Sequence, residues 1–362
     1  MTAFVTGPIF VFRGRKYLPA VWGDDKELLD HAINRTAPIG RFHFVDPLGL
    51  FDPFAGYAAF LLRLVTQLVR LGGEQHYSNH VFFIMTILWT LFACWIAGIV
   101  MNVSSPIIGF ISAFIIAVMP FSNLVLMAQL NTLAWPSVLV LSLTILTRQY
   151  PRSKVSQVLV VAYFSALTLT TIIVLVPFGY LVWLFKSQRH SMQKTERVLL
   201  KSMAGAFVIQ ALSFTPRGRS INPLKLIHEF SLTAYAFAPQ FLRMRILDQK
   251  SVIDVLILYG IPLILFAATF CLFRIASGGP LQNNVDMAIK LFVVALVTLG
   301  LLIVGNGWLN SHYLFIPTAL FWIGSLLLAQ GAISSSRSYK FIPVGIIAVI
   351  FLSGLSGKYF VI

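Results

Sequence analysis

Long apolar stretches with few or no charged residues recur along the whole chain. A helix needs about 20 mostly apolar residues to cross the hydrocarbon core of a bilayer, which is about 30 Å thick. Backbone groups find no water partner there, so such stretches favour helices, and the alternating segments of a membrane barrel are absent. The pattern predicts an all-α, polytopic helical membrane protein of roughly eight to ten membrane helices, some of them short or re-entrant. The candidate windows are Val81–Met101, Pro106–Met127, Leu133–Thr147, Val252–Phe273, Leu291–Gly305, His312–Ala332, Phe341–Ser356 and the shorter Val198–Phe214.

The composition points the same way. Hydrophobic residues make up 58% and charged residues 11% of the 362 residues, against about 45–50% and about 25% in soluble domains. A large soluble surface needs charge, so most of this surface must face something other than water. The two cysteines, Cys94 and Cys271, each lie inside a candidate window. Their separation argues against a disulfide framework and against a cysteine-based metal site.

Short connections between the windows carry an excess of Lys and Arg, which is typical of cytoplasmic loops. These connections are Arg148–Lys154, Lys186–Lys201 and the segment that holds Arg337 and Lys340. With them inside, residues 13–80 form a first extracytoplasmic loop and residues 215–251 a second, within a single membrane domain over residues 1–362. The net charge of +15 then reflects topology, and we expect no nucleic-acid partner.

The segment Val155–Phe185 has two interpretations. It is long for one span, yet basic stretches flank both of its ends. Two half-length helices that meet near Thr168, Thr170 and Thr171 would keep both basic ends on one side. One tilted helix with an imperfect charge rule is the alternative.

The first outer loop holds the main candidates for acid–base chemistry. Asp24 and Asp25 are adjacent carboxylates, which are suited to act as a general base or to hold a divalent cation such as Mg²⁺ or Mn²⁺. The alternative is that they form the solvated start of a helix, where the helix dipole favours negative charge. No cofactor is fixed by the sequence.

A second feature of this loop is an amphipathic segment. Pro53 is predicted to be the first residue of a helix that Asp52 caps. In the following Ala58–Leu71, Arg63 and Arg70 lie on one face. This pattern is typical of an interfacial helix, and its basic side chains are also suited to contact lipid phosphate.

The second outer loop is basic, although outer loops are usually poor in Lys and Arg. Guanidinium groups match phosphate geometry through paired hydrogen bonds, and general attraction to anionic headgroups is the alternative. The candidates for phosphate binding in this loop are Arg217, Arg219, Arg243 and Arg245. At outer helix ends, amide and aromatic groups are suited to bind sugar hydroxyls, or act as interfacial anchors. Those groups are Asn131, Trp135, His312 and Tyr313.

Signatures of several common enzyme classes are missing. The sequence contains no Walker loop, no dinucleotide-binding glycine pattern, no HExxH or CxxC pair, and no Gly-x-Ser-x-Gly. Their absence argues against nucleotide-driven pumps and the common hydrolases.

The order of the remaining motifs resembles the GT-C class of membrane glycosyltransferases, in particular its uncharacterised bacterial members. That class has an acidic motif in the first outer loop, a PYAGY-like phrase and a downstream Arg. Here these correspond to Asp24-Asp25, to Pro53-Phe54-Ala55-Gly56-Tyr57 and to Arg63. Further matches are Asn131 to Trp135, Ala166–Pro177 and His312-Tyr313-Leu314-Phe315-Ile316-Pro317.

The sequence also departs from the GT-C pattern in three places. Met1–Phe12 is shorter than a full first membrane helix, and Ala58-Ala59-Phe60 stands where a His commonly follows the AGY phrase. Thr170-Thr171 replaces an expected Gly-Pro. These departures leave open two alternatives, a truncated start or a relative that has lost catalysis.

The resemblance implies an inverting sugar transfer at the outer face of the cell membrane, from a polyprenyl-phosphate-linked sugar to a glycan or lipid acceptor. Asp24 or Asp25 would act as the base, and Arg63 with the loop arginines would bind the donor phosphate. The chain would be embedded in membrane lipids as a multi-pass protein. Two alternatives are a non-catalytic assembly subunit and a transporter or flippase for lipid-linked sugars. A carrier needs polar residues inside its spans, and the windows contain almost none.

Overall fold

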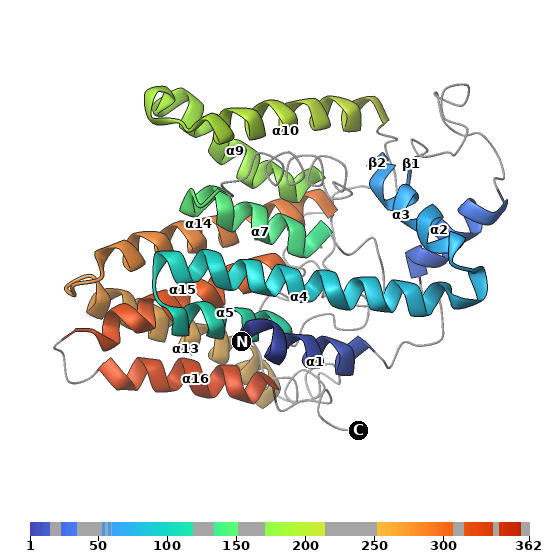
Figure 1. The fold of residues 1–362 in the computed structure, drawn as a ribbon. Coiled ribbons are helices and arrows are strands. Elements are labelled where there is room, and N and C mark those ends of the chain that lie inside the picture. The colour runs from blue at the N-terminus through green and yellow to red at the C-terminus, as the bar shows by residue number, and fades with distance from the viewer. Residues whose placement is uncertain are drawn as a thin grey trace. The chain divides into compact units, whose positions relative to one another are not determined.

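The computed structural model describes residues 1–14, 23–34, 53–54, 57–58, 60–118, 134–150, 171–213, 252–306, 315–335 and 340–355. These residues are helical apart from short turns and one pair of two-residue strands (Figure 1). The elements up to residue 118 are α1 (Thr2–Gly14), α2 (Gly23–Asn34), β1 (Pro53–Phe54), β2 (Tyr57–Ala58), α3 (Phe60–Leu71), η2 (Glu74–His76), α4 (Tyr77–Val103) and α5 (Pro106–Val118). The elements that follow are α7 (Ala134–Thr147), α9 (Thr171–Ser187), η4 (Arg189–Ser191), α10 (Lys194–Ser213), α13 (Val252–Ala276), α14 (Gln282–Asn306), α15 (Phe315–Ile333) and α16 (Phe341–Leu355).

The described helices agree, in length and composition, with the membrane character that the apolar windows predict. Three of those described, over Tyr77–Val103, Gln282–Leu302 and Phe315–Ile333, are long and apolar enough to cross a membrane. Shorter apolar helices occur as well. Helix α10, which covers the window Val198–Phe214 as far as Ser213, is not among the described helices that are apolar enough for either group. The number of spans, predicted as roughly eight to ten, stays a prediction.

The predicted helix start at Pro53 is wrong. Pro53 and Phe54 form β1, which pairs antiparallel with Tyr57 and Ala58 in β2. The helix begins only at Phe60. Aromatic residues favour strands and glycine disfavours helices, so the phrase with Gly56 suits a short strand pair better than a first helical turn.

The described residues pack into two compact units that interleave along the chain. The first comprises Met1–Ile9, Ala93–Asn123 and Ser220–Ile362, and the second Phe10–Phe92 and Leu124–Arg219. Helices α1 and α4 contribute residues to both. The single membrane domain over residues 1–362 stays a prediction.

In the first unit, α15 is the central helix. It packs against α5, α13 and α14, and α13 packs in turn against α16. Of the most apolar part of α15, 72% is buried, against 44% for α14. Large apolar side chains on the outer helices are exposed, among them Phe266 on α13, Leu296 on α14 and Phe341 on α16. Apolar faces of this kind are suited to lipid rather than to water.

The connections of this unit meet at one end. Ser104 follows α4, Gly279 lies between α13 and α14, and Ser335 follows α15. A Cβ on Gly279 would lie 3.7 Å from the Ser335 Cβ, and the side chains of Ser104 and Gln330 are hydrogen-bonded. These contacts bring the three connections together within the first unit.

In the second unit, α3 packs against α2, and α9 packs against both α7 and α10. The Phe178 and Phe207 rings, 4.8 Å apart, join α9 to α10. Helix α9 begins at Thr171, where the two predicted half-length helices were expected to meet. Residues 151–170, which would form the first half, lie outside the described residues, so both interpretations of Val155–Phe185 stay open.

Candidate functional site

The two candidate carboxylates lie at the start of α2. Gly23 is the first residue of this helix, so Asp24 and Asp25 lie in its first turn; their side chains lie outside the described residues. The side chains of Leu28, Leu29 and Ala32 are buried, and α2 packs on α3. The acidic pair therefore begins a helix that is packed into the second unit.

The arginines of α3 are held by the protein. The Arg63 side chain is 6% exposed, within a buried stripe that includes Leu62, Thr66 and Val69. The Arg70 Nη1 donates a hydrogen bond to the Ala32 carbonyl oxygen in the last turn of α2. A cation at this position satisfies a terminal carbonyl and stabilises the negative end of the helix dipole. Arg70 thus has a structural role that an isolated interfacial helix would not explain.

Trp135 is the second residue of α7 and belongs to the same unit as α2 and α3. Its side chain is only 4% exposed. An interfacial anchor would have to reach the headgroups, so burial disfavours that interpretation for Trp135. The other candidate residues lie outside the described residues: Asn131, Arg217, Arg219, Arg243, Arg245, His312 and Tyr313.

A polar cluster in the second unit was not predicted. Glu196, in the first turn of α10, is fully buried. The Arg148 guanidinium donates from Nε to Glu196 Oε1 at 2.7 Å and from Nη2 to Oε2 at 2.9 Å. Two further groups donate hydrogen bonds to this carboxylate. The Tyr150 hydroxyl lies 3.0 Å from Oε1, and the Gln193 backbone nitrogen lies 2.7 Å from Oε2. This carboxylate therefore caps α10 and fixes the end of α7 beside it.

The backbone of Arg148 explains why this contact matters. Arg148 has a φ of 56°, a left-handed conformation that usually falls to glycine at a helix end. Its N–H bonds to the Ile145 carbonyl and that of Gln149 to the Thr144 carbonyl, which closes α7. The charged hydrogen bonds to Glu196 offset the strain of a side chain at this position.

The electrostatics of the cluster are consistent with this geometry. The hydrogen bond to Glu196 raises the pKa of Arg148, so the guanidinium stays charged. Burial, followed by the negative charge of Glu196, raises the pKa of Tyr150 far above its usual range, so the phenol remains a neutral donor. The cluster also joins the end of α7 to the start of α10. The predicted membrane topology stays a prediction.

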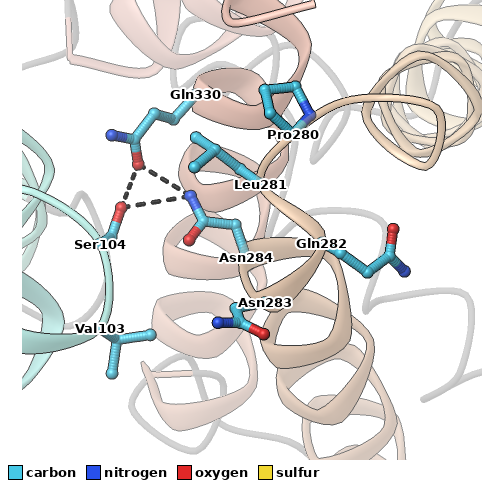
Figure 2. A pocket seen from close by; sticks show the side chains of 8 residues that line it. All are labelled: Val103, Ser104, Pro280, Leu281, Gln282, Asn283, Asn284 and Gln330. Atoms are coloured by element: carbon cyan, nitrogen blue, oxygen red, sulfur yellow. Dashed lines mark hydrogen bonds between the residues drawn. The ribbon is translucent and has the colours of Figure 1, made fainter.

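A second polar cluster lines a cavity of about 200 Å³ in the first unit. Figure 2 shows Ser104, Asn284 and Gln330 directed at one another across it. Asn284 Nδ2 donates to Gln330 Oε1 at 2.9 Å and to Ser104 Oγ at 3.3 Å, and Ser104 Oγ donates to Gln330 Oε1. Asn284 is 3% exposed, so these bonds satisfy a buried amide and hold α14 and α15 to the end of α4.

These two clusters were difficult to predict from the sequence. Glu196 stands out only as the one acid in the basic segment Lys186–Lys201. Asn284 lies outside the apolar windows, because α14 begins nine residues before the predicted Leu291. Gln330 lies near the end of its window. Polar residues at helix ends are ordinarily solvated, and only tertiary packing shows which of them are buried.

Compared with known proteins, the chain matches no family model, and no curated protein and no solved structure is similar to it. The resemblance to GT-C glycosyltransferases therefore depends on the sequence motifs alone.

Proposed function

We propose that the protein is a membrane glycosyltransferase. It transfers a sugar from a polyprenyl-phosphate-linked donor to a glycan or lipid acceptor of the cell envelope, at the outer face of the cell membrane. The observation that carries this proposal is the packing of α2 on α3. The helix whose first turn contains Asp24 and Asp25 lies against the helix with the buried Arg63, so two GT-C-like motifs belong to one local structure.

The chemistry needs a base and a cation. Asp24 or Asp25 accepts the proton of the acceptor hydroxyl, and the hydroxyl oxygen then forms a bond to the anomeric carbon. The bond from that carbon to the phosphate oxygen breaks, and polyprenyl phosphate leaves with the electron pair. Direct attack inverts the anomeric centre. Arg63 stabilises the charge of the departing phosphate through charge-assisted hydrogen bonds.

Further residues are assigned on the motifs and on residue type. The arginines of the second outer loop provide additional contacts to the donor phosphate: Arg217, Arg219, Arg243 and Arg245. Stacking and hydrogen-bonding groups hold the sugar and the acceptor: Asn131, Trp135, His312 and Tyr313. A divalent cation would neutralise the leaving phosphate. Among the described residues no three His, Cys, Asp or Glu side chains could share a metal ion, so the proposal assigns no metal ligand.

A lipid-linked donor requires a protein that meets the bilayer laterally. Three of the helices in the described part of the chain are long and apolar enough to span a membrane, and the outer helices of the first unit expose large apolar side chains. These features support a donor that reaches the protein from the membrane rather than from water.

The direct test is a transfer assay with Asp-to-Asn variants. An amide keeps the size of the carboxylate but cannot take the proton, so we expect Asp24→Asn or Asp25→Asn to lower the turnover of a polyprenyl-phosphate sugar by about 10²–10⁴. Asp30→Asn is the matched control, because Asp30 is exposed on the same helix; its turnover should stay unchanged.

Normal turnover in both single variants and in the double variant would refute the assignment of the base. If the unmodified protein transfers sugar from no polyprenyl-phosphate donor, the enzyme proposal itself fails. The protein would then be a non-catalytic assembly subunit or a flippase for lipid-linked sugars. Binding of a lipid-linked sugar without turnover would support these two alternatives.

A further inference from the structure

In the second unit, the end of α9 and the start of α10 form an exposed and strongly basic surface. Figure 1 shows the course of these two helices. We define this basic surface by five exposed cations: Lys186, Arg189, Lys194, Arg197 and Lys201. The one acid in the segment, Glu196, is fully buried and neutralised by Arg148. The positive charge of the basic surface is therefore not offset by a neighbouring exposed carboxylate of the same segment.

The geometry of α10 concentrates these charges. Lys194, Arg197 and Lys201 follow at spacings of three and four residues, so they form one stripe of the helix. Glu196, Leu199 and Met203 form the opposite stripe, and all three are buried. The same helix thus fixes its inner face in the protein and directs its cations outward.

Element η4 adds a fourth cation at a defined position. Arg197 Nη2 donates a hydrogen bond to the Arg189 carbonyl oxygen at 3.2 Å, which ties η4 to α10. The Arg189 guanidinium carbon lies 5.3 Å from the centre of the Phe185 ring, a cation–π contact. Arg189 is therefore held beside the stripe on α10.

Aromatic residues indicate the depth of the basic surface in the bilayer. Trp183 is 51% exposed and Phe185 39% exposed, and the Tyr180 and Trp183 rings lie 5.5 Å apart. They occupy the last turns of the apolar helix α9, immediately before Lys186. Tyr and Trp gather at the membrane–water interface, so the cations that follow lie at the level of lipid headgroups.

The exposed face of α10 changes character along the helix. Beyond Lys201 it presents Ala204, Gly205 and Val208, and Val208 is 60% exposed. Cations in the first two turns are thus followed by an apolar strip on the same face. A phospholipid has the same order, with a charged headgroup followed by acyl chains.

We propose that the basic surface is a binding site for an anionic phospholipid, with the lipid phosphate between Arg189 and the stripe on α10 and an acyl chain along the apolar strip. A soluble phosphate would make no use of Val208, and an acidic peptide would not need the aromatic residues at interface depth. The site does not depend on the proposed sugar transfer. The predicted topology puts it in the cytoplasmic leaflet, where anionic lipids attract basic segments.

The test is lipid binding to the full chain in neutral detergent, measured by native mass spectrometry. Phosphatidylglycerol is compared with phosphatidylcholine of the same acyl chains. We expect phosphatidylglycerol to bind at least about 25-fold more tightly. Each cation at a membrane surface contributes about fivefold in affinity, so the double variant Lys194→Gln with Lys201→Gln should lose about 25-fold for phosphatidylglycerol and little for phosphatidylcholine.

The matched control is Lys26→Gln with Lys290→Gln, which removes two exposed lysines elsewhere. It should keep its affinity within about threefold, as should Lys194→Arg with Lys201→Arg, which preserves charge. Equal binding of the two lipids would overturn the proposal, and so would an equal loss in the control pair. If glycerol phosphate displaces phosphatidylglycerol when the two are present at the same concentration, the site binds a soluble anion instead.

Discussion

At the scale of single residues, the fully buried Glu196 is the clearest case of a charge that the fold depends on. It lies among four donors, two of them from the guanidinium of Arg148. The partners differ in exposure: the Glu196 side chain is 0% exposed and that of Arg148 31%. The carboxylate has no access to water, so its charge is compensated mainly by Arg148. The guanidinium is partly hydrated and needs Glu196 less.

We therefore predict unequal effects of two neutral substitutions. Arg148→Gln leaves a buried, uncompensated carboxylate and should lower the free energy of unfolding by about 3–5 kcal/mol. Glu196→Gln keeps the shape and leaves the guanidinium partly in water, so its loss should be about 1–2 kcal/mol. Denaturant unfolding of the purified protein in detergent measures both values.

One control accompanies this comparison. Arg189→Gln removes an exposed arginine from the same region and should change stability by less than about 0.5 kcal/mol. If Glu196→Gln proves the more damaging change, the assignment of the buried charge is wrong.

At the scale of elements, apolar patterning predicts where helices lie but not where they end. The window Val81–Met101 is contained in α4, and Phe341–Ser356 nearly coincides with α16. The structure extends α14 to the polar Gln282, because hydropathy marks the lipid-facing part of a helix rather than its capped end. The segment around Pro53 forms two strands instead of a helix start. The preference of proline for the first helical position is outweighed there by aromatic residues that pair across the strands.

Close approach between helices is a second feature that patterning cannot show. A Cβ on Gly109 of α5 would lie 2.6 Å from the Ala97 carbonyl oxygen and 2.9 Å from the Met101 Cβ. Backbone atoms cannot move aside as a flexible side chain can. A small residue is therefore required where α5 crosses α4, as is common between membrane helices.

We predict that Gly109→Ala lowers the free energy of unfolding by about 1–3 kcal/mol, since the added methyl group overlaps α4. Gly98→Ala on α4 is the matched control, because its Cβ would meet nothing within 4 Å. That change should be neutral or stabilising by up to about 1 kcal/mol, as alanine favours a helix. Thermal unfolding in detergent checks both. Similar losses in the two variants would contradict the close contact between α4 and α5.

At the scale of the whole molecule, the sequence predicts an α-helical membrane protein, and the described helices agree. The candidate site is less predictable. Asp24 and Asp25 do lie in the first turn of a helix, and Arg63 is buried in the adjacent one, but neither the burial of Arg63 nor the contact of Arg70 with α2 follows from an amphipathic pattern. Burial depends on which elements pack together, and this information is not local in sequence.

Two proposals concern opposite faces of the membrane. Sugar transfer uses the acidic start of α2, and the phospholipid site uses the exposed ends of α9 and α10. We therefore predict that these two regions face different sides of the membrane. Each contains an exposed residue suited to labelling: Lys26 on α2 and Ser187 at the end of α9.

Cysteine labelling in intact cells tests this claim most directly. Cys94 and Cys271 are first replaced, and single cysteines are introduced as Lys26→Cys or Ser187→Cys. An impermeant thiol reagent should label the first variant in intact cells and the second only after the membrane is permeabilised. Labelling at both positions in intact cells, or at position 187 alone, would contradict the orientation on which the account is built.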